Sequence, residues 1–217
     1  MSTAPNHGFA GFSREAFTFF RNLAKNNNKD WFHANKGAYE VSCRDALKAL
    51  TVVLDPPFGA DRLTRINRDM RFARDKSAPY RTQISTVVRG NYLSLSADGL
   101  YVGTGIYMPD APTLRRLREA IAADDSGRKL ASMVAPLRRK GYTVATHESV
   151  DGVPRGFSAD HPRLELLRMK DIHAGKMFAA SSEITTPKAV QQIRRACEDI
   201  APLRDWILRY VGLGNVR

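Results

Sequence analysis

Residues 65–80 hold the densest mixture of side chains in the chain that could bind or react with a ligand. The segment reads Arg-Ile-Asn-Arg-Asp-Met-Arg-Phe-Ala-Arg-Asp-Lys-Ser-Ala-Pro-Tyr. In an extended strand successive side chains face opposite ways, which predicts one polar and one apolar face. The polar face consists of Arg65, Asn67, Asp69 and Arg71, and the apolar face of Ile66, Met70 and Phe72. Arg68 alone breaks the alternation.

This composition indicates a site for an anion. Arginine presents several N–H donors in a rigid plane that matches a phosphate or carboxylate group. An aspartate between arginines would orient a guanidinium group, and Asp69 is placed to do so. We therefore expect a ligand with a phosphate or carboxylate group to be bound by Arg65, Arg68, Arg71 and Lys76, with Tyr80 nearby.

A second polar cluster lies at residues 154–163, followed by Lys170. Arg155, His161, Arg163 and Lys170 are the residues of this cluster that we expect to complete the pocket. The alternative is a plain loop-to-helix junction, in which Asp160 or His161 caps a short helix. If the protein is an enzyme, His161 is the natural general acid or base, because histidine is the side-chain type that ordinarily titrates nearest neutrality, and Tyr80 or Lys76 would assist. No residue identifies a nucleophile, so catalysis stays an open question.

Several familiar motifs are missing from the sequence. There is no glycine-rich phosphate loop, dinucleotide-binding fingerprint or serine nucleophile elbow. The five histidines, at positions 7, 33, 147, 161 and 173, are too scattered to predict a metal site, so we expect no metal and no cofactor. Cys43 and Cys197 fall in helical patterns without metal-type spacing, which predicts buried free thiols.

The charge of the chain keeps two further hypotheses open. A net charge of +12 and a pI near 10.0 favour anionic partners, including nucleic acid. A nucleic-acid binding module would use the basic residues of helices within 112–140 and the hairpin tyrosines, namely Arg115, Arg116, Arg118, Arg138, Arg139, Lys140, Tyr92, Tyr101 and Tyr107. Alternatively, Asp69 and Asp75 would bridge several arginines in a purely structural ion-pair network.

The sequence predicts a single α+β domain over residues 1–217, with residues 1–8 as a flexible tail. The predicted elements are helices over 14–25, with Ser13 as a candidate cap, and 30–54, a strand over 83–88, a hairpin over 93–107, helices over 110–123 and 126–140, a strand over 142–150, a short helix over 162–167, a strand over 170–179 and a helix over 186–211. This order favours a mainly antiparallel sheet with helices segregated largely to one side. Without a long apolar stretch or a signal peptide, we expect a cytoplasmic protein with no membrane contact.

The hairpin is the clearest supersecondary signal. A two-residue turn at Asp98-Gly99 would pair Leu95 with Val102. Its leucines and valine would then lie on the core, and its small residues would form a shallow floor between the tyrosines. We expect either a neighbouring helix or a ligand to approach closely at Gly103 and Gly105.

Residues 65–83 also resemble the signature of the family known as domain of unknown function 2461. That signature is Arg, two residues, Arg-Asp, one residue, Arg-Phe, three residues, Lys, one residue, Pro-Tyr, two residues, Asn. The spacing matches from Arg65 to Lys76, but one extra residue precedes Pro79, and Gln83 replaces the final Asn. The resemblance extends to Asn26-Asn27, Trp31-Phe32, the segment from Gly103 to Pro109 and the segment from Pro154 to Pro162. It implies an α+β cytoplasmic-type protein of about this size and no particular reaction.

Overall fold

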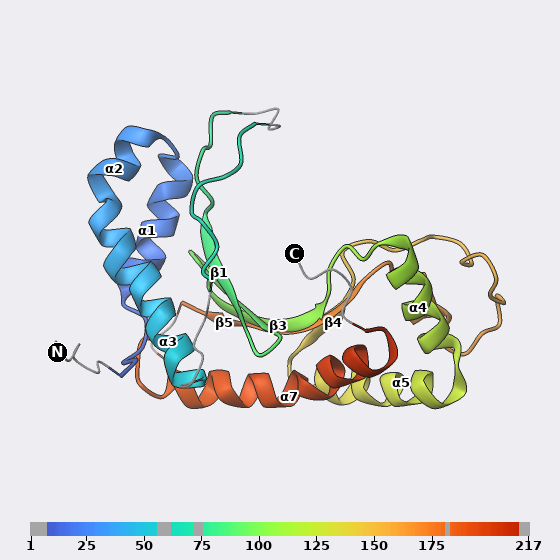
Figure 1. The fold of residues 1–217 in the computed structure, drawn as a ribbon. Helices are drawn as coiled ribbons and strands as arrows, with labels where there is room; N and C mark the ends of the chain where they lie inside the picture. The colour runs from blue at the N-terminus through green and yellow to red at the C-terminus, as the bar shows by residue number, and fades with distance from the viewer. Residues whose placement is uncertain (1–7, 56–61, 72–75, 181–182, 213–217) are drawn as a thin grey trace, which may run out of the picture. The chain divides into compact units, whose positions relative to one another are not determined.

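The computed structural model describes residues 8–55, 62–71, 76–180 and 183–212 (Figure 1). Its strands form a five-stranded antiparallel sheet in the order β1-β2-β3-β5-β4. They are β1 (Gln83–Val88), β2 (Asn91–Ser96), β3 (Gly99–Ile106), β4 (Thr143–Ala145) and β5 (Ile172–Ala179). Together with the helices, this sheet confirms the predicted α+β class.

The helices lie close to the segments that the sequence predicts. They are α1 (Arg14–Lys25), α2 (Lys29–Ala38), the π-helix η1 (Tyr39–Asp45), α3 (Ala46–Leu54), α4 (Ala111–Ala122), α5 (Asp124–Arg139), α6 (Leu164–Arg168) and α7 (Ala189–Tyr210). Asp110 caps α4 as predicted, because its Oδ1 accepts a hydrogen bond from the backbone N–H of Thr113 at 2.9 Å. Asp30, the residue at which the second helix is predicted to begin, does not cap α2, because Asn28 accepts the N–H of Trp31 instead.

The chain divides into two compact units. The first unit comprises residues 1–102 and 177–195, and the second comprises residues 103–176 and 196–217. Strands β3 and β5 and helix α7 contribute residues to both units. The single domain expected over the whole chain stays a prediction, and each unit is described below by itself.

The first unit is built around α1 and a cluster of aromatic rings. Helix α1 lies beside α2 (Figure 1). Of the apolar positions that its helical periodicity predicts to be buried, Ala16, Phe17, Phe20 and Leu23 are buried and Ala24 is exposed, and Phe19 is buried as well. The rings of Phe32 and Tyr80 stack with centroids 4.1 Å apart and planes 18° from parallel. This stack links α2 to the end of the arginine-rich segment.

Asn27, in the loop between α1 and α2, forms two hydrogen bonds to the backbone at the end of the arginine-rich segment. Its Nδ2 donates to the carbonyl oxygen of Tyr80 at 2.9 Å, and its Oδ1 accepts the backbone N–H of Tyr80 at 2.9 Å. The Tyr80 backbone also forms an antiparallel bridge with Asn67, and the two stretches of chain run beside each other in Figure 1. The neighbouring N–H groups of Arg68 and Arg81 donate to Pro79 and Ile66. The extended arm predicted from alternation therefore exists, held by backbone pairing and by one asparagine side chain.

The hairpin turn lies one residue earlier than predicted. Strand β2 ends at Ser96 and β3 begins at Gly99, so the turn residues are Ala97 and Asp98. The four apolar strand residues, Leu93, Leu95, Leu100 and Val102, are fully buried, as expected. A strand, rather than a helix or a ligand, approaches Gly105: a Cβ atom there would stand 2.4 Å from the carbonyl oxygen of Ile172 in β5. Gly99, at the start of β3, is approached in the same way, since a Cβ atom there would stand 2.0 Å from the carbonyl oxygen of Phe178.

In the core of the second unit, the buried Trp206 of α7 donates a hydrogen bond from its indole N–H to the carbonyl oxygen of Ser126 at 2.8 Å.

Strand β4 pairs with β5, and the isolated bridge between Ser149 and Met169 continues the same register. The strand predicted over 142–150 is thus observed as the three-residue β4 and the isolated bridge at Ser149. Within the described residues, no helix is long and apolar enough to cross a membrane.

Some predictions fall on residues outside the described ranges. They concern the N-terminal tail apart from Gly8, and the side chains of Phe72 and Asp75.

We expect Asn27→Ala to lower the free energy of unfolding by about 1–3 kcal/mol, because the N–H and C=O groups of the buried Tyr80 would each lose a partner. Urea denaturation measures this change. Asn35→Ala is the matched control, since the Asn35 side chain donates one hydrogen bond within its own helix, to Trp31. Equal losses for the two variants would contradict the role given to Asn27.

Both cysteines should resist alkylation in the folded protein. Burial raises the pKa of Cys43 to about 12 and that of Cys197 to about 11, and the thiolate is the reactive form. With iodoacetamide at about pH 8, mass spectrometry should show slow labelling of half-buried Cys197, still slower labelling of Cys43, and rapid labelling of both in urea. Rapid labelling of Cys43 in the native protein would contradict the burial of this thiol and its raised pKa.

Candidate functional site

An open pocket of about 350 Å³ lies in the first unit, beside the arginine-rich arm. Its lining residues are Ala24, Asn27, Arg68, Ala78, Tyr80, Arg81, Thr82 and Gln83. Among the described residues, the lining includes two arginines and no acidic residue. These residues therefore offer an anion N–H donors and no like charge.

Arg68, the residue that breaks the alternation of the arm, is the predicted anion-binding arginine that lines this pocket. Its backbone N–H is fixed by Pro79, and one Nη1–H bond to the carbonyl oxygen of Ala78, at 3.2 Å, steadies the guanidinium group. Arg81 faces the same pocket from the opposite stretch of the arm, and both side chains are exposed. Neither guanidinium group forms an ion pair with a carboxylate of the described residues.

The other predicted ligand residues of this unit lie outside the pocket lining, except Tyr80. Arg65, Asp69, Arg71 and Lys76 are exposed. The Asp69 carboxylate accepts hydrogen bonds from the Arg71 guanidinium, with Nη2 and Oδ2 2.7 Å apart, and these bonds hold the pKa of Asp69 below its ordinary value. Asp69 thus orients a guanidinium group as predicted. Tyr80 is only 4% exposed, and its ring packs against Phe32.

The geometry gives little support to a structural network centred on Asp69. Its ion pair joins two exposed side chains only two residues apart, and such surface pairs contribute little to stability. Asp75, the second member of that hypothesis, lies outside the described residues. A buried carboxylate does exist in this unit, but it belongs to Asp55, whose Oδ1 lies 2.7 Å from Nη2 of Arg89.

The predicted cluster of the second unit is largely engaged in local structure. Arg163 is buried, and its Nε and Nη2 donate to the carbonyl oxygens of Ile121 and Ala122, both at 2.7 Å, where α4 ends. The ring Nδ1 of His161 accepts the backbone N–H of Arg163 at 3.1 Å. These contacts favour the loop-to-helix junction over ligand binding. Of the remaining residues, Lys170 pairs with Glu148 at 2.8 Å, and Arg155 is exposed.

Four of the six basic residues invoked for nucleic-acid binding have local partners, whereas Arg115 and Arg139 are exposed. Arg116 donates to the carbonyl oxygen of Val211 at 2.7 Å, and Arg118 to that of Leu167 at 3.2 Å. Arg138 pairs with Glu165, and Lys140 with Asp199. These side chains fasten the helices of the second unit together, so no observation singles out this surface for nucleic acid.

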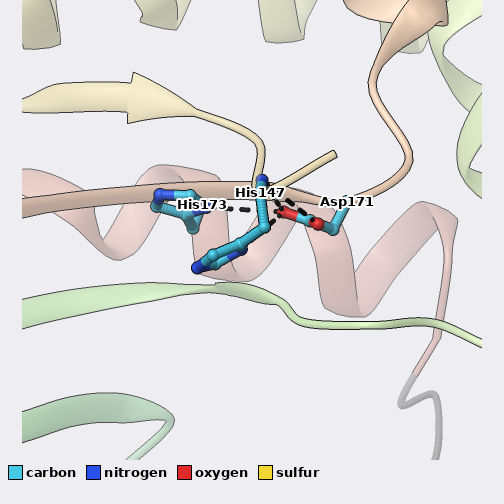
Figure 2. Close-up of side chains that lie close together, drawn as sticks. All are labelled: His147, Asp171 and His173. Atoms are coloured by element: carbon cyan, nitrogen blue, oxygen red, sulfur yellow. Dashed lines mark hydrogen bonds and ion pairs between the residues drawn. The ribbon is translucent and has the colours of Figure 1, made fainter. Parts of the chain in front are cut away.

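Sequence reasoning missed a cluster in the second unit, formed by His147, Asp171 and His173 (Figure 2). Ala145 is the register partner of His173 in the antiparallel pair of β4 and β5. The same register, continued two residues past Ala145 and two residues before His173, places His147 opposite Asp171. Because side chains two residues apart share a face of a strand, Asp171 and His173 lie on the same face as His147. The backbone N–H of His147 donates to both Asp171 oxygens, at 3.1 and 3.3 Å, and closes the arrangement.

The three side chains differ in exposure. The Asp171 side chain is 3% exposed, that of His173 is 22% exposed and that of His147 is 50% exposed. Burial and the neighbouring His147 lower the pKa of His173, against the opposing effect of Asp171. The sequence signal was a pair of predicted strands, but their register could not be read because residues 151–169 separate them.

Comparison with known proteins places the chain in a family without assigning a reaction. Conserved hypothetical proteins (DUF2461) match residues 15–206, a range that contains both the Arg68 pocket and the His147 cluster. No curated protein matches the chain. Because the match spans most of the 217 residues, the chain belongs to the DUF2461 family of conserved hypothetical proteins, as the resemblance of its arginine-rich signature implied.

Proposed function

We propose that the first unit binds a small ligand bearing a phosphate or carboxylate group in the Arg68 pocket. The observation that carries this proposal is that Arg68 and Arg81 line one pocket, and that no acidic residue lines it among the residues that the structure describes. Guanidinium groups that have no carboxylate partner keep their donors available for an external anion.

The remaining lining side chains suit the recognition of an anion. Thr82 and Gln83 add a hydroxyl and an amide beside the two arginines, and both are exposed. Asn27 contributes less directly, because its amide already holds the Tyr80 backbone and so shapes the pocket wall. Gln83 occupies the position where the family signature has Asn, which keeps an amide at this wall.

The volume and chemistry of the pocket favour binding of a small molecule. About 350 Å³ is near the lower end of the range for small-ligand pockets, roughly 300–1,000 Å³. The described lining residues include no histidine, cysteine or carboxylate, which are the usual general bases and nucleophiles. We therefore propose a binding role for the pocket and assign it no reaction.

Removing either arginine should weaken anion binding. A hydrogen bond to a charged group contributes about 1.5–3 kcal/mol, so Arg68→Ala and Arg81→Ala should each raise the Kd for inorganic phosphate at least about tenfold. Chemical-shift titration of the ¹⁵N-labelled protein measures this Kd and identifies the amides that respond. A parallel titration with succinate tests whether a carboxylate serves as well as a phosphate.

Arg65→Ala is the matched control, because it removes the same charge from the same arm at an exposed position outside the pocket lining. Its Kd should change by no more than about twofold, the scale of an unpaired surface charge. Equal weakening of phosphate binding by all three variants would contradict the proposal, because it would show that the anion is attracted by the net positive charge of the protein and not bound in the pocket. Binding that neither Arg68→Ala nor Arg81→Ala alters would also refute the proposal.

A further inference from the structure

His147, Asp171 and His173 form a compact set of donors in the second unit. Each offers a ring nitrogen or a carboxylate oxygen, and these atoms lie within 4.8 Å of one another. The Nδ1 atoms of His147 and His173 lie 3.1 and 3.5 Å from the same atom, Oδ1 of Asp171. Ligands about 2.0–2.1 Å from a tetrahedral metal ion stand about 3.3 Å apart, so both separations match the spacing of ligand atoms around one ion.

The Asp171 carboxylate is buried without a permanently charged partner. Its side chain is 3% exposed, and the ion pairs that it forms among the described residues are with His147 and His173, whereas the adjacent Lys170 pairs with Glu148. A buried carboxylate is costly unless a positive charge or a metal ion compensates it. The backbone N–H of His147 reaches both oxygens but supplies no net charge.

A second, independent observation concerns His173. Its Nδ1 atom is buried and has no hydrogen-bond partner, although Oδ1 of Asp171 lies 3.5 Å away, within the range of an ion pair. Buried polar atoms in folded proteins almost always have a partner, and an atom without one is unusual. A metal ion between Nδ1 and the carboxylate would satisfy both groups at once.

Neighbouring residues hold both rings in place. The backbone of Gly105 approaches so closely that a Cβ atom there would stand 2.6 Å from the Cβ of His173. The ring of Tyr107 meets that of His147 edge to face, with centroids 4.7 Å apart. The two histidine rings themselves have centroids 4.4 Å apart, and Figure 2 shows both beside the Asp171 carboxylate. Such packing preorganises ligands before an ion binds.

We propose that His147, Asp171 and His173 bind one divalent first-row transition-metal ion, such as Zn²⁺ or Fe²⁺. Two imidazoles and one carboxylate are a ligand set of zinc and non-haem iron sites that leave coordination positions open, whereas Mg²⁺ and Ca²⁺ prefer oxygen ligands. The half-exposed His147 leaves the ion accessible to water or a small ligand from one side. This inference is independent of the anion pocket, which uses other residues in the other unit.

Cobalt(II) is a suitable probe, because it replaces Zn²⁺ and gives visible absorption that depends on its ligands. The tag-free protein should bind one Co²⁺ per chain. Zn²⁺ should displace it, anaerobic Fe²⁺ should do so only in large excess, and Mg²⁺ and Ca²⁺ should not displace it. Calorimetry with Zn²⁺ should show an affinity at least about 100-fold lower for His147→Asn, since loss of even an outer-sphere partner of a ligand costs about 10–100-fold.

His147→Asn should keep its fold, because the side chain is half exposed and the backbone N–H that binds Asp171 is retained. Circular dichroism checks this, and His173→Asn supplies a second variant with the same expected loss. His33→Asn changes an exposed histidine of α2 and should leave the affinity unchanged. The proposal is overturned if the protein binds neither Co²⁺ nor Zn²⁺, or if His33→Asn weakens binding as much as His147→Asn does.

Discussion

Antiparallel pairing of extended backbone places the ligand-binding candidates in both units of this protein. In the first unit the bridge between Asn67 and Tyr80 folds the arginine-rich arm back on itself, and Arg68 and Arg81 then face one pocket. In the second unit the register that pairs Ala145 with His173 also sets His147 opposite Asp171. A slip of one residue would turn each set of side chains to the other face, so register is the constraint on which both sites depend.

The two sites use charge in opposite ways because they differ in burial. The arginines of the pocket are exposed, so they stay charged at little cost without a protein partner, and water can give way to an anion. Asp171 is buried, so its charge needs compensation within the fold or from a bound cation. The Asp69–Arg71 pair is exposed as well, and it orders a local turn of chain rather than the core.

Local patterns predicted most of the elements, and the misses arise where distant segments meet. Helical periodicity, the cap at Asp110 and the alternation around Ile66 all correspond to observed structure, because each depends on neighbours in sequence. The pocket role of Arg81, the double hydrogen bond of Asn27 and the cluster of His147 with Asp171 depend on chain pairing over long separations, for which a single sequence carries no local signal. Arg163 shows the converse, since a charge that suggested a ligand instead holds the end of a helix.

Uptake of an oxyanion by the Arg68 pocket is the central claim, and a crystal soaked in tungstate, a heavy tetrahedral analogue of phosphate, tests it most directly. The anomalous difference map should place a tungsten peak between the guanidinium groups of Arg68 and Arg81, with oxygens at hydrogen-bonding distance from both. Peaks confined to the basic helices α4 and α5, with none at Arg68, would contradict this claim.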